Sequence, residues 1–209
     1  MSLNFHRQLD VLDVPRLAQL PITVIGAGAV GSCTVLALAK SGAERITVYD
    51  DDRIEAHNLP NQWYRLADLG RPKVEALRDL VRDMAGVELD IRPHRFDGKG
   101  ASEVTICAVD SMDVRIALWR QLHPRPRLYI DARMGAEVGK VLCVGPFASW
   151  YDETLYPSSE ALQAPCTARA TMYCASGLGA FIASQVANYA SDRPTRQEMT
   201  VDFRNGIML

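Results

Sequence analysis

Several features that would assign the sequence to a membrane or nucleic-acid class are absent from it. No apolar run in the 209 residues reaches the roughly 18–20 residues that a membrane-spanning helix needs. The first residues, MSLNFHRQLDVLDV, lack the apolar core of a secretory signal peptide. The formal net charge is -2, so no basic field attracts nucleic acid or an anionic membrane. We therefore expect neither a membrane nor a nucleic acid as a partner.

The cysteines have a pattern that argues against both disulfides and zinc. The five cysteines are scattered and odd in number, which is unlike a disulfide framework and favours a cytoplasmic protein. No two of them form a C-x-x-C pair. Cys166 and Cys174 are separated by seven residues, and no histidine follows either one. We therefore expect no structural zinc site.

The size and composition are those of one ordinary globular unit. Hydrophobic residues make up 48% of the chain and charged residues 23%, which is the balance of a soluble protein. A chain of 209 residues has room for a full core. The sequence shows no internal repeat, low-complexity tract or linker. We predict a single domain over residues 1–209.

Apolar patterns alternate between strands and helices along most of the chain. Short apolar or β-branched runs predict strands, and apolar stripes at helical spacing predict helices. The expected strands are 22–25, 45–49, 87–92, 104–109, 128–131 and 140–144, and the expected helices are 29–41, 73–85, 112–122 and 173–190. Such an alternation is typical of a parallel sheet with helices on both faces.

The last two expected strands break this alternation. Only residues 132–139 join them, which is too short for a parallel crossover and favours an antiparallel pair. Residues 148–172 contain Pro157 and Pro165 and predict a long irregular loop, which in a compact domain is usually functional or mobile. The predicted fold is α/β: a Rossmann-like, mainly parallel sheet with helices on both faces and an antiparallel C-terminal extension.

A glycine motif follows the first expected strand. Gly26-Ala-Gly28-Ala-Val-Gly31 is G-x-G-x-x-G, and it opens the first expected helix. The first glycine permits the tight turn, the second lets the backbone approach a phosphate, and the third lets helix and strand pack closely. The helix N-terminus offers amides and a partial positive charge to an anion. Asp50 ends the next strand, where an acidic side chain accepts ribose hydroxyls. These features predict a bound nucleotide without distinguishing NAD from ATP.

The residues after Asp50 carry a resemblance to a known family. Asp50-Asp-Asp52-Arg-Ile-Glu-Ala-His-Asn58-Leu-Pro-Asn61-Gln62 resembles D-x-D-x-V-x-x-S-N-L-x-R-Q of the ThiF/MoeB family, which includes the adenylation domains of ubiquitin-activating enzymes. Three further segments look like that family's G-x-P-K, C-x-D-N-x-x-x-R and the end of R-Y-x-R-Q-I: Gly70-Arg-Pro-Lys73, Ala108-Val-Asp110-Ser-Met-Asp-Val-Arg115 and Phe5-His-Arg7-Gln8-Leu9. With the glycine motif, the pieces keep the family's order from residue 5 to about 190.

The resemblance implies a set of ligands and roles. It implies ATP and Mg²⁺, with Lys73 contacting the phosphates and Asp110 holding the metal ion. The nucleotide site would further include Gly26, Gly28, Gly31, Asp50, Asp52, Asn58 and Gln62. It also implies a homodimer in which Arg7 reaches the ATP site of the partner subunit.

Each of these roles has a plainer alternative. Lys73 would otherwise be an ordinary solvated helix lysine. Asp110 would otherwise cap the helix that starts at Met112. Arg7 would otherwise be a surface arginine on a frayed N-terminus.

The chain departs from the family at Asn61, where the family has a second phosphate-contacting arginine. The departure removes a positive charge from the expected site and bears on the rate of ATP turnover. Arg65 and Arg71 follow closely enough in the sequence to be candidates for compensating it.

Cys166 is the cysteine for which a chemical role is open. It lies in Ala-Pro-Cys-Thr-Ala-Arg, within the expected long loop. In the family, a cysteine at this place accepts the activated acyl group or takes part in sulfur transfer. Nearby Arg169 favours the nucleophilic thiolate, whereas the alternative is an inert buried thiol. The other four cysteines, Cys33, Cys107, Cys143 and Cys174, are expected in the core.

The resemblance therefore implies ATP-dependent adenylation of the C-terminal carboxylate of a ubiquitin-like β-grasp protein, with possible transfer to Cys166. One alternative keeps the chemistry but takes a tRNA-borne or peptide carboxylate. Another is a non-catalytic member that acts as a binding module, which Asn61 favours. A third is an NAD-dependent dehydrogenase, for which the matches at Asn58, Gln62, Lys73 and Asp110 would be accidental.

Overall fold

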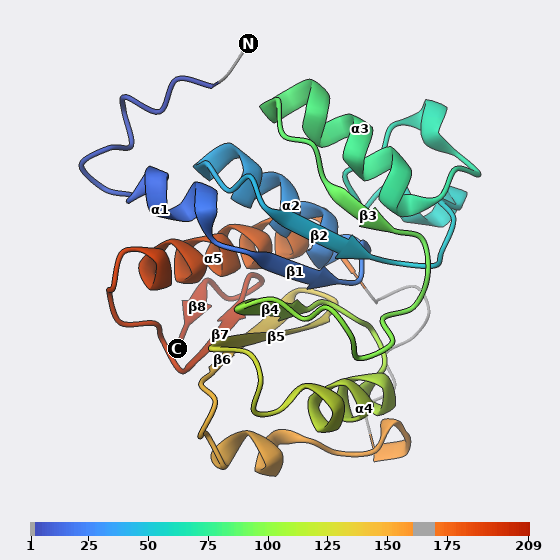
Figure 1. Cartoon of the computed structure of the whole chain (residues 1–209). Helices are drawn as coiled ribbons and strands as arrows, with labels where there is room; N and C mark the ends of the chain where they lie inside the picture. Colours follow the sequence, from blue (N-terminus) through green and yellow to red (C-terminus); the bar gives the residue numbers. More distant parts are fainter. Residues whose placement is uncertain (1–2, 161–169) are drawn as a thin grey trace.

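The computed structural model describes residues 3–160 and 170–209, and its centre is one eight-stranded sheet (Figure 1). The order of the strands across the sheet is β3-β2-β1-β4-β5-β6-β7-β8. Their bounds are β1 (Ile22–Ile25), β2 (Ile46–Tyr49), β3 (Asp90–Arg92), β4 (Val104–Cys107), β5 (Leu128–Gly135), β6 (Val138–Val144), β7 (Glu198–Asp202) and β8 (Ile207–Met208).

The sheet has a parallel half and an antiparallel half. Strands β3, β2, β1, β4 and β5 are parallel neighbours, and Ile25 of β1 lies opposite Cys107 of β4. From β5 onwards, β6, β7 and β8 pair antiparallel. The predicted fold class is thereby confirmed. The chain order reverses between β1 and β4, and the carboxyl ends at such a switch point are where ligands bind in open α/β sheets.

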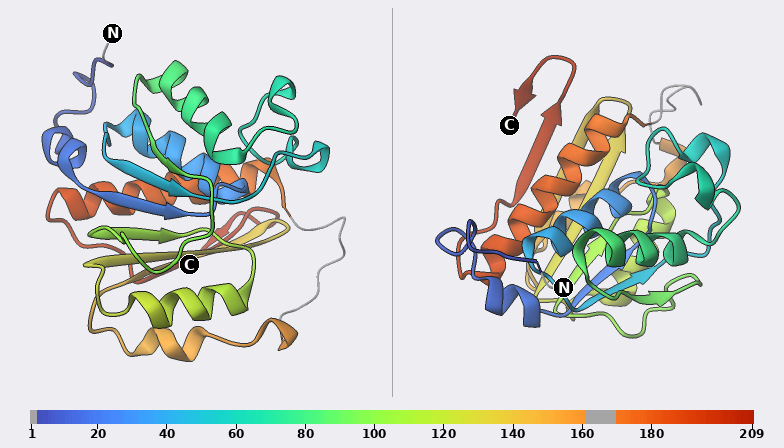
Figure 2. Two further views of the ribbon diagram at one scale, coloured as in Figure 1. Left: turned by 45° about the vertical axis from the view of Figure 1, so that its right-hand side comes forward. Right: turned by 90° about the horizontal axis from the view of Figure 1, so that it is seen from above.

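Helices cover both faces of the sheet, as Figures 1 and 2 show. The α-helices are α1 (Val14–Gln19), α2 (Ala29–Ser41), α3 (Lys73–Ala85), α4 (Met112–Leu122) and α5 (Met172–Ala190). The 3₁₀ turns are η1 (Ala56–Asn58), η2 (Leu66–Asp68), η3 (Trp150–Thr154) and η4 (Ser158–Glu160). Helices α2, α3 and α5 lie on one face, while α4 and η3 lie on the other. None of the helices described is long and apolar enough to cross a membrane.

The core has two parts, one on each face of the sheet. Every residue of β1 and of β4 is buried, as expected for central parallel strands. The larger part packs the sheet against α2, α3 and α5. The smaller part contains aromatic rings among aliphatic side chains: the ring of Trp119 on α4 lies 4.6 Å from that of Tyr151 in η3, centroid to centroid.

Helices α2 and α5 approach each other closely. A Cβ placed on Gly179 of α5 would lie 2.7 Å from the Cβ of Cys33 on α2, so only glycine permits this packing. The prediction of a tightly packed helix near the C-terminus is confirmed, with its start one residue earlier, at Met172.

Some predicted boundaries were wrong. The link between β5 and β6 is a turn of two residues, Ala136 and Glu137, because both strands extend beyond their apolar cores to complete a hairpin. Strand β4 ends at Cys107, two residues earlier than predicted. The stretch 148–172 is not wholly irregular, since η3 buries Tyr151 completely. Helix α1 and strands β7 and β8 were not predicted.

Candidate functional site

The glycine loop joins β1 to α2 at the switch point of the sheet. Gly26 has φ +99°, and a Cβ there would lie 2.6 Å from the carbonyl oxygen of Ala108. A Cβ on Gly31 would lie 1.9 Å from the carbonyl oxygen of Gly26. A Cβ on Gly28 would meet nothing within 4 Å among the described residues. Two glycines are therefore required by the fold itself, while Gly28 borders open space at the N-terminus of α2.

Asp50 holds the start of this loop from the end of β2. One carboxylate oxygen accepts the Ala27 amide at 2.7 Å, and the other accepts the Asp52 amide at 2.8 Å. Burial raises the pKa of Asp50, against the Ala27 hydrogen bond and the positive charge of Lys73. Each carboxylate oxygen can accept a second hydrogen bond, so Asp50 retains capacity for a ribose hydroxyl.

Lys73 begins α3 and points back to the same edge. Its ammonium lies 2.7 Å from a carboxylate oxygen of Asp52, and its side chain is only 8% exposed, against 62% for Asp52. The alternative of an ordinary solvated lysine is therefore wrong. An ammonium has three donors, so the contact with Asp52 leaves others for an anion. The carboxylates of Asp50, Asp51 and Asp52 all lie within 4.8 Å of one another.

The segment between β2 and α3 folds back onto the glycine loop. The Tyr64 hydroxyl donates to the Ala27 carbonyl at 2.6 Å, and the Trp63 amide donates to the Ser32 hydroxyl at 3.3 Å. Sequence reasoning did not single out Tyr64. The only available signal was an aromatic residue directly after the Gln62-Trp pair.

This segment places two amide side chains with unsatisfied oxygens beside the loop. Gln62 is 9% exposed, and neither its Oε1 nor the buried Oδ1 of Asn61 has a hydrogen-bond partner within residues 3–160 and 170–209. Asn58 differs, because its Oδ1 caps η1 by accepting the Glu55 amide at 2.9 Å. A buried polar atom without a partner is uncommon in folded proteins and points to a missing ligand or water.

Arg65 and Arg71 do not replace the charge that Asn61 lacks. Both form ion pairs with buried Asp68, at 2.9 Å and 2.8 Å, and Arg71 also pairs with Asp79 at 2.5 Å. These pairs hold η2 against α3. The possibility that either arginine compensates for Asn61 is therefore not supported, because their guanidinium groups are already used.

Asp110 follows β4 and reaches the same edge as the glycine loop. Ile25 and Cys107 are aligned across β1 and β4, so Asp110 stands as far beyond its strand as Gly28 does beyond β1. Asp110 is exposed, and within the described part of the chain its carboxylate has no recorded hydrogen bond or ion pair. The N-cap of α4 is Ser111, which accepts the Val114 amide. The capping alternative for Asp110 is therefore wrong.

Arg115 and Asp131 form a buried ion pair beneath this edge. Arg115 ends the family-like motif that contains Asp110, and Asp131 ends the apolar run of β5. Although burial alone lowers the pKa of Arg115, the Asp131 carboxylate raises it above the ordinary value. No local pattern in the sequence links Arg115 to Asp131, because their contact depends on the pairing of β4 with β5.

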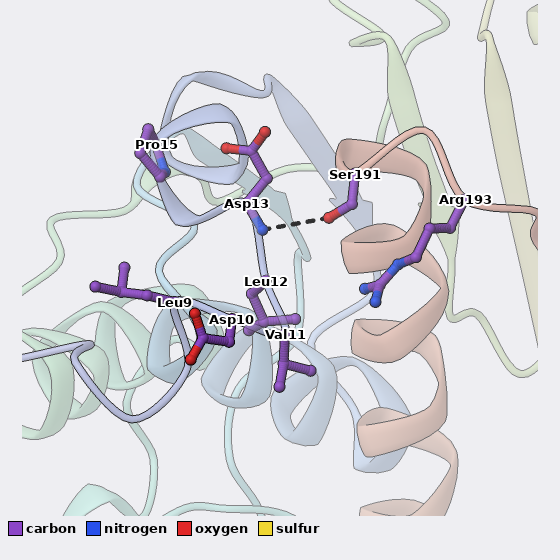
Figure 3. A pocket seen from close by; sticks show the side chains of 8 residues that line it. All are labelled: Leu9, Asp10, Val11, Leu12, Asp13, Pro15, Ser191 and Arg193. Carbon is purple, nitrogen blue, oxygen red and sulfur yellow. Dashed lines mark hydrogen bonds between the residues drawn. The ribbon is translucent and has the colours of Figure 1, made fainter.

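Arg7 is not brought to the glycine loop of its own chain. The ring of Phe5 lies against Gly42, which ends α2, and a helix of 13 residues is roughly 20 Å long. Arg7 is exposed near that far end. Residues 9–13 and Pro15, which follow Arg7 in the chain, line a cavity of about 500 Å³ together with Ser191 and Arg193. Figure 3 shows these side chains, and the Asp13 amide donates to the Ser191 hydroxyl at 3.3 Å. That cavity contains no predicted site residue.

The cysteines divide into four that are described and one that is not. Cys166 lies outside the described residues. Cys33, Cys107, Cys143 and Cys174 are buried and free, as expected for core residues. Burial raises the pKa of all four thiols, to about 12 for Cys143 and about 11 for Cys174, which keeps them protonated and unreactive.

Comparison with known proteins finds similar sequences over part of the chain. The model of the ThiF family matches residues 3–199. The NEDD8-activating enzyme E1 catalytic subunit of Arabidopsis thaliana is 44% identical over 75 residues, which are 35% of this chain and 16% of that protein. The sulfur carrier protein adenylyltransferase of Thermus thermophilus is 31% identical over 114 residues, 48% of this chain and 40% of that protein. A Saccharomyces cerevisiae tRNA threonylcarbamoyladenosine dehydratase 2 is 30% identical over 116 residues, 50% and 26% respectively. The matches thus span less than half of each relative.

Solved structures show the same fold. Escherichia coli MccB in complex with MccA-N7isoASN superposes with a TM-score of 0.76 at 14% identity, over 100% of this chain and 71% of that one. MccB with ATP gives a TM-score of 0.72 at 13% identity, over 94% and 64%. At such identities the likeness concerns the fold alone.

Proposed function

The chain belongs to the ThiF family, and on that premise we propose that it binds Mg·ATP and adenylates the C-terminal carboxylate of a ubiquitin-like β-grasp protein. One observation carries the proposal. The open position at Gly28, the buried ammonium of Lys73 and the exposed carboxylate of Asp110 all lie at the carboxyl edge of β1 and its neighbouring strands.

These groups suit the reaction because both substrates, the carboxylate and ATP, are anions. A carboxylate oxygen attacks the α-phosphorus of ATP, a new P–O bond forms, and the bond to the β-phosphate oxygen breaks to release pyrophosphate. Two anions must approach, and charge accumulates on the leaving group, so catalysis depends on positioning and electrostatic stabilisation. The amides at the start of α2 and the Lys73 ammonium supply that stabilisation.

Asp110 fits the metal ion that such a reaction uses. Mg²⁺ prefers carboxylate oxygens and usually keeps one or two of them together with phosphate oxygens. The Asp110 carboxylate is exposed, whereas Asp50 accepts two amides and Asp52 pairs with Lys73. Asp110 would therefore hold the ion, which on binding neutralises phosphate charge.

Gln62, Asn58 and Asp50 complete the nucleotide site in this proposal. The unsatisfied Oε1 of Gln62 would accept a ribose hydroxyl or a water, and the side-chain amides of Gln62 and Asn58 would donate to phosphate or ribose oxygens. A buried acceptor left without a partner costs about 1–3 kcal/mol, so a ligand that satisfies it gains that amount.

Asn61 supports one rival, a family member that binds a partner without turning over ATP. The side chain carries no charge, and the nearest candidate arginines are held by Asp68 and Asp79. In the catalytic proposal, Arg7 from a second copy of the chain adds a second cation, beside Lys73, that stabilises the leaving pyrophosphate. This makes a homodimer a requirement for activity rather than an accessory feature.

Pyrophosphate release in the presence of ATP and candidate acceptors tests the proposal. A β-grasp protein with a free C-terminal carboxylate should stimulate release, and the same protein carrying a C-terminal amide should not. Lys73→Met should abolish the signal, while Lys40→Met, at the other end of α2, should not change it. Stimulation only by a peptide or by tRNA would move the substrate to those carboxylates. No release with any acceptor, despite ATP binding, would favour the binding module.

Transfer to Cys166 is a separate part of the proposal. If the cysteine attacks the acyl-adenylate, a thioester forms, AMP leaves, and the thiol proton passes to solvent or a base. The acceptor protein should then remain attached in denaturing gels without reductant and be released by a thiol. Cys166→Ala should lose this adduct while keeping the first turnover of pyrophosphate release. An adduct that persists in Cys166→Ala would contradict the role of that residue.

A further inference from the structure

Asp131 is a fully buried carboxylate that the proposed reaction does not use. It lies in the middle of β5, where it is the last residue of that strand paired with β4. Its partner Cys107 comes three residues before Asp110. Its oxygens accept from Arg115, from the Nε of Arg133 at 2.7 Å and from the Tyr151 hydroxyl at 2.9 Å. Three separate elements, α4, β5 and η3, therefore meet on one carboxylate.

Arg115 connects this carboxylate to the backbone of Asp110. The same guanidinium donates to the carbonyl oxygens of Val109 and Ala132, the latter at 2.9 Å. The Val109 carbonyl and the Asp110 amide belong to one planar peptide group. Fixing the carbonyl oxygen therefore fixes the nitrogen and Cα of Asp110, the point from which its side chain extends.

The other partners connect Asp131 to η3. Arg133 donates to the carbonyl oxygen of Thr154 at 2.8 Å and to its hydroxyl at 2.9 Å. The Arg133 guanidinium also lies over the Tyr151 ring, 5.8 Å from the centroid. Arg133 and Tyr151 thus hold the Asp131 carboxylate from the side of η3, while Arg115 contacts it from α4.

We propose that Asp131, held by Arg133 and Tyr151, is a positioning residue for Asp110 and acts through Arg115 and the Val109 peptide. The inference rests on the proposed function, because it concerns where Asp110 places the metal ion of Mg·ATP. Residues 150–154 and the metal-holding carboxylate then share one support. Removing the contact of Arg133 or Tyr151 with Asp131 should weaken metal binding, although both residues are distant from Asp110 in the sequence.

The charge balance makes this testable in folded protein. Two guanidinium groups surround one carboxylate, so removal of Arg133 leaves the neutral Arg115–Asp131 pair. By contrast, removal of Asp131 would leave the buried cation of Arg115 and the partly buried cation of Arg133 without a counter-charge, which is strongly destabilising. The informative variants are therefore Arg133→Met, Arg133→Lys and Tyr151→Phe.

Titration of Mn²⁺ into the protein–ATP complex, followed by electron paramagnetic resonance, measures the metal site without requiring turnover. Arg133→Met should weaken Mn²⁺ binding roughly tenfold, the lower end of the range for residues that orient metal ligands. Tyr151→Phe should act in the same direction, and Arg133→Lys should act less, because lysine keeps a charge beside Asp131 but not the fork to Thr154. Arg120→Met, an exposed position on α4, is the matched control and should change nothing.

Metal-free ATP affinity should be equal in all of these proteins, which separates positioning from general damage. Wild-type Mn²⁺ affinity in both Arg133→Met and Tyr151→Phe, with normal melting temperatures, would overturn the inference and leave the proposed function intact. Wild-type protein that binds no Mn·ATP would overturn the proposed function and this inference with it.

Discussion

Substitution by alanine should affect ATP binding at Gly28 and protein stability at Gly31. Gly28→Ala places a methyl group in open space, since no atom of the described residues lies within 4 Å, and the φ of -75° and ψ of -149° lie at the margin of the extended region. Alanine is a poorer N-cap by about 0.5–1 kcal/mol, but it restrains the unfolded chain by about 0.4–1 kcal/mol, so the two effects nearly cancel. The free energy of unfolding should therefore change by less than about 0.5 kcal/mol.

Gly31→Ala has no such space. Its methyl carbon would lie 1.9 Å from the Gly26 carbonyl oxygen, which is backbone and cannot rotate away. The strand and helix must separate, and overpacking of this kind costs about 1–3 kcal/mol or more. For a chain of this size each kcal/mol lowers the melting temperature by about 2–4 °C, so the drop should reach several degrees.

ATP affinity, measured on the folded proteins, should be more sensitive to Gly28→Ala than to Gly31→Ala. If a phosphate approaches the backbone at Gly28, a methyl group there removes an amide contact to a charged group, worth about 1.5–3 kcal/mol. Titration calorimetry should then show ATP affinity lower by about 10- to 100-fold in Gly28→Ala, with an unchanged melting curve. Unchanged ATP affinity in Gly28→Ala would refute the placement of the phosphates, and an unchanged melting temperature in Gly31→Ala would refute the loop geometry.

Three further results are expected. Arg7→Ala and Lys73→Met should each be inactive alone, but mixed and re-equilibrated subunits should regain about a quarter of wild-type activity, since half the dimers then contain one intact site; no recovery would exclude action across an interface. Because Arg71 and Arg78 hydrogen bonds lower the pKa of Asp79 to about 2, the stability this carboxylate contributes is present above its ordinary pKa of 3.8 and lost as the pH falls towards 2. Asp79→Asn should therefore cost about 1 kcal/mol in urea unfolding at pH 6, after allowance for solvent screening, and almost nothing near pH 2; an equal difference at both pH values would contradict the pairing. A colorimetric thiol reagent should modify at most one cysteine in the native protein, Cys166, because the other four are buried; two or more fast-reacting thiols would contradict their burial.

Local patterns in the sequence were sufficient for the part of the fold that holds the glycine loop. The run Ile22–Ile25, the glycine motif and the apolar helix after it are adjacent in the chain, so their strand, turn and helix depend mainly on nearby residues. Both α2 and α3 end at a glycine in the structure, since Gly42 and Gly86 follow them and adopt positive φ.

Contacts between distant segments were beyond the same reasoning. The sequence contains Arg115, Asp131 and Tyr151, but their convergence depends on which strands are neighbours and on where η3 packs. The commitment of Arg65 and Arg71 to Asp68 and Asp79 was equally hidden. Helix α1 and strands β7 and β8 were missed for a different reason: they have only six, five and two residues, too few to show a clear period.

Titration calorimetry with ATP, in the presence and absence of Mg²⁺, tests most directly whether the glycine loop, Lys73 and Asp110 act on one triphosphate. Wild-type protein should bind ATP more tightly with Mg²⁺, and Lys73→Met should weaken binding by about 10- to 100-fold in both conditions. Asp110→Asn should keep the metal-free affinity and lose the gain from Mg²⁺. Retention of that gain in Asp110→Asn, or binding of NAD as tightly as ATP by the wild type, would contradict the proposed site.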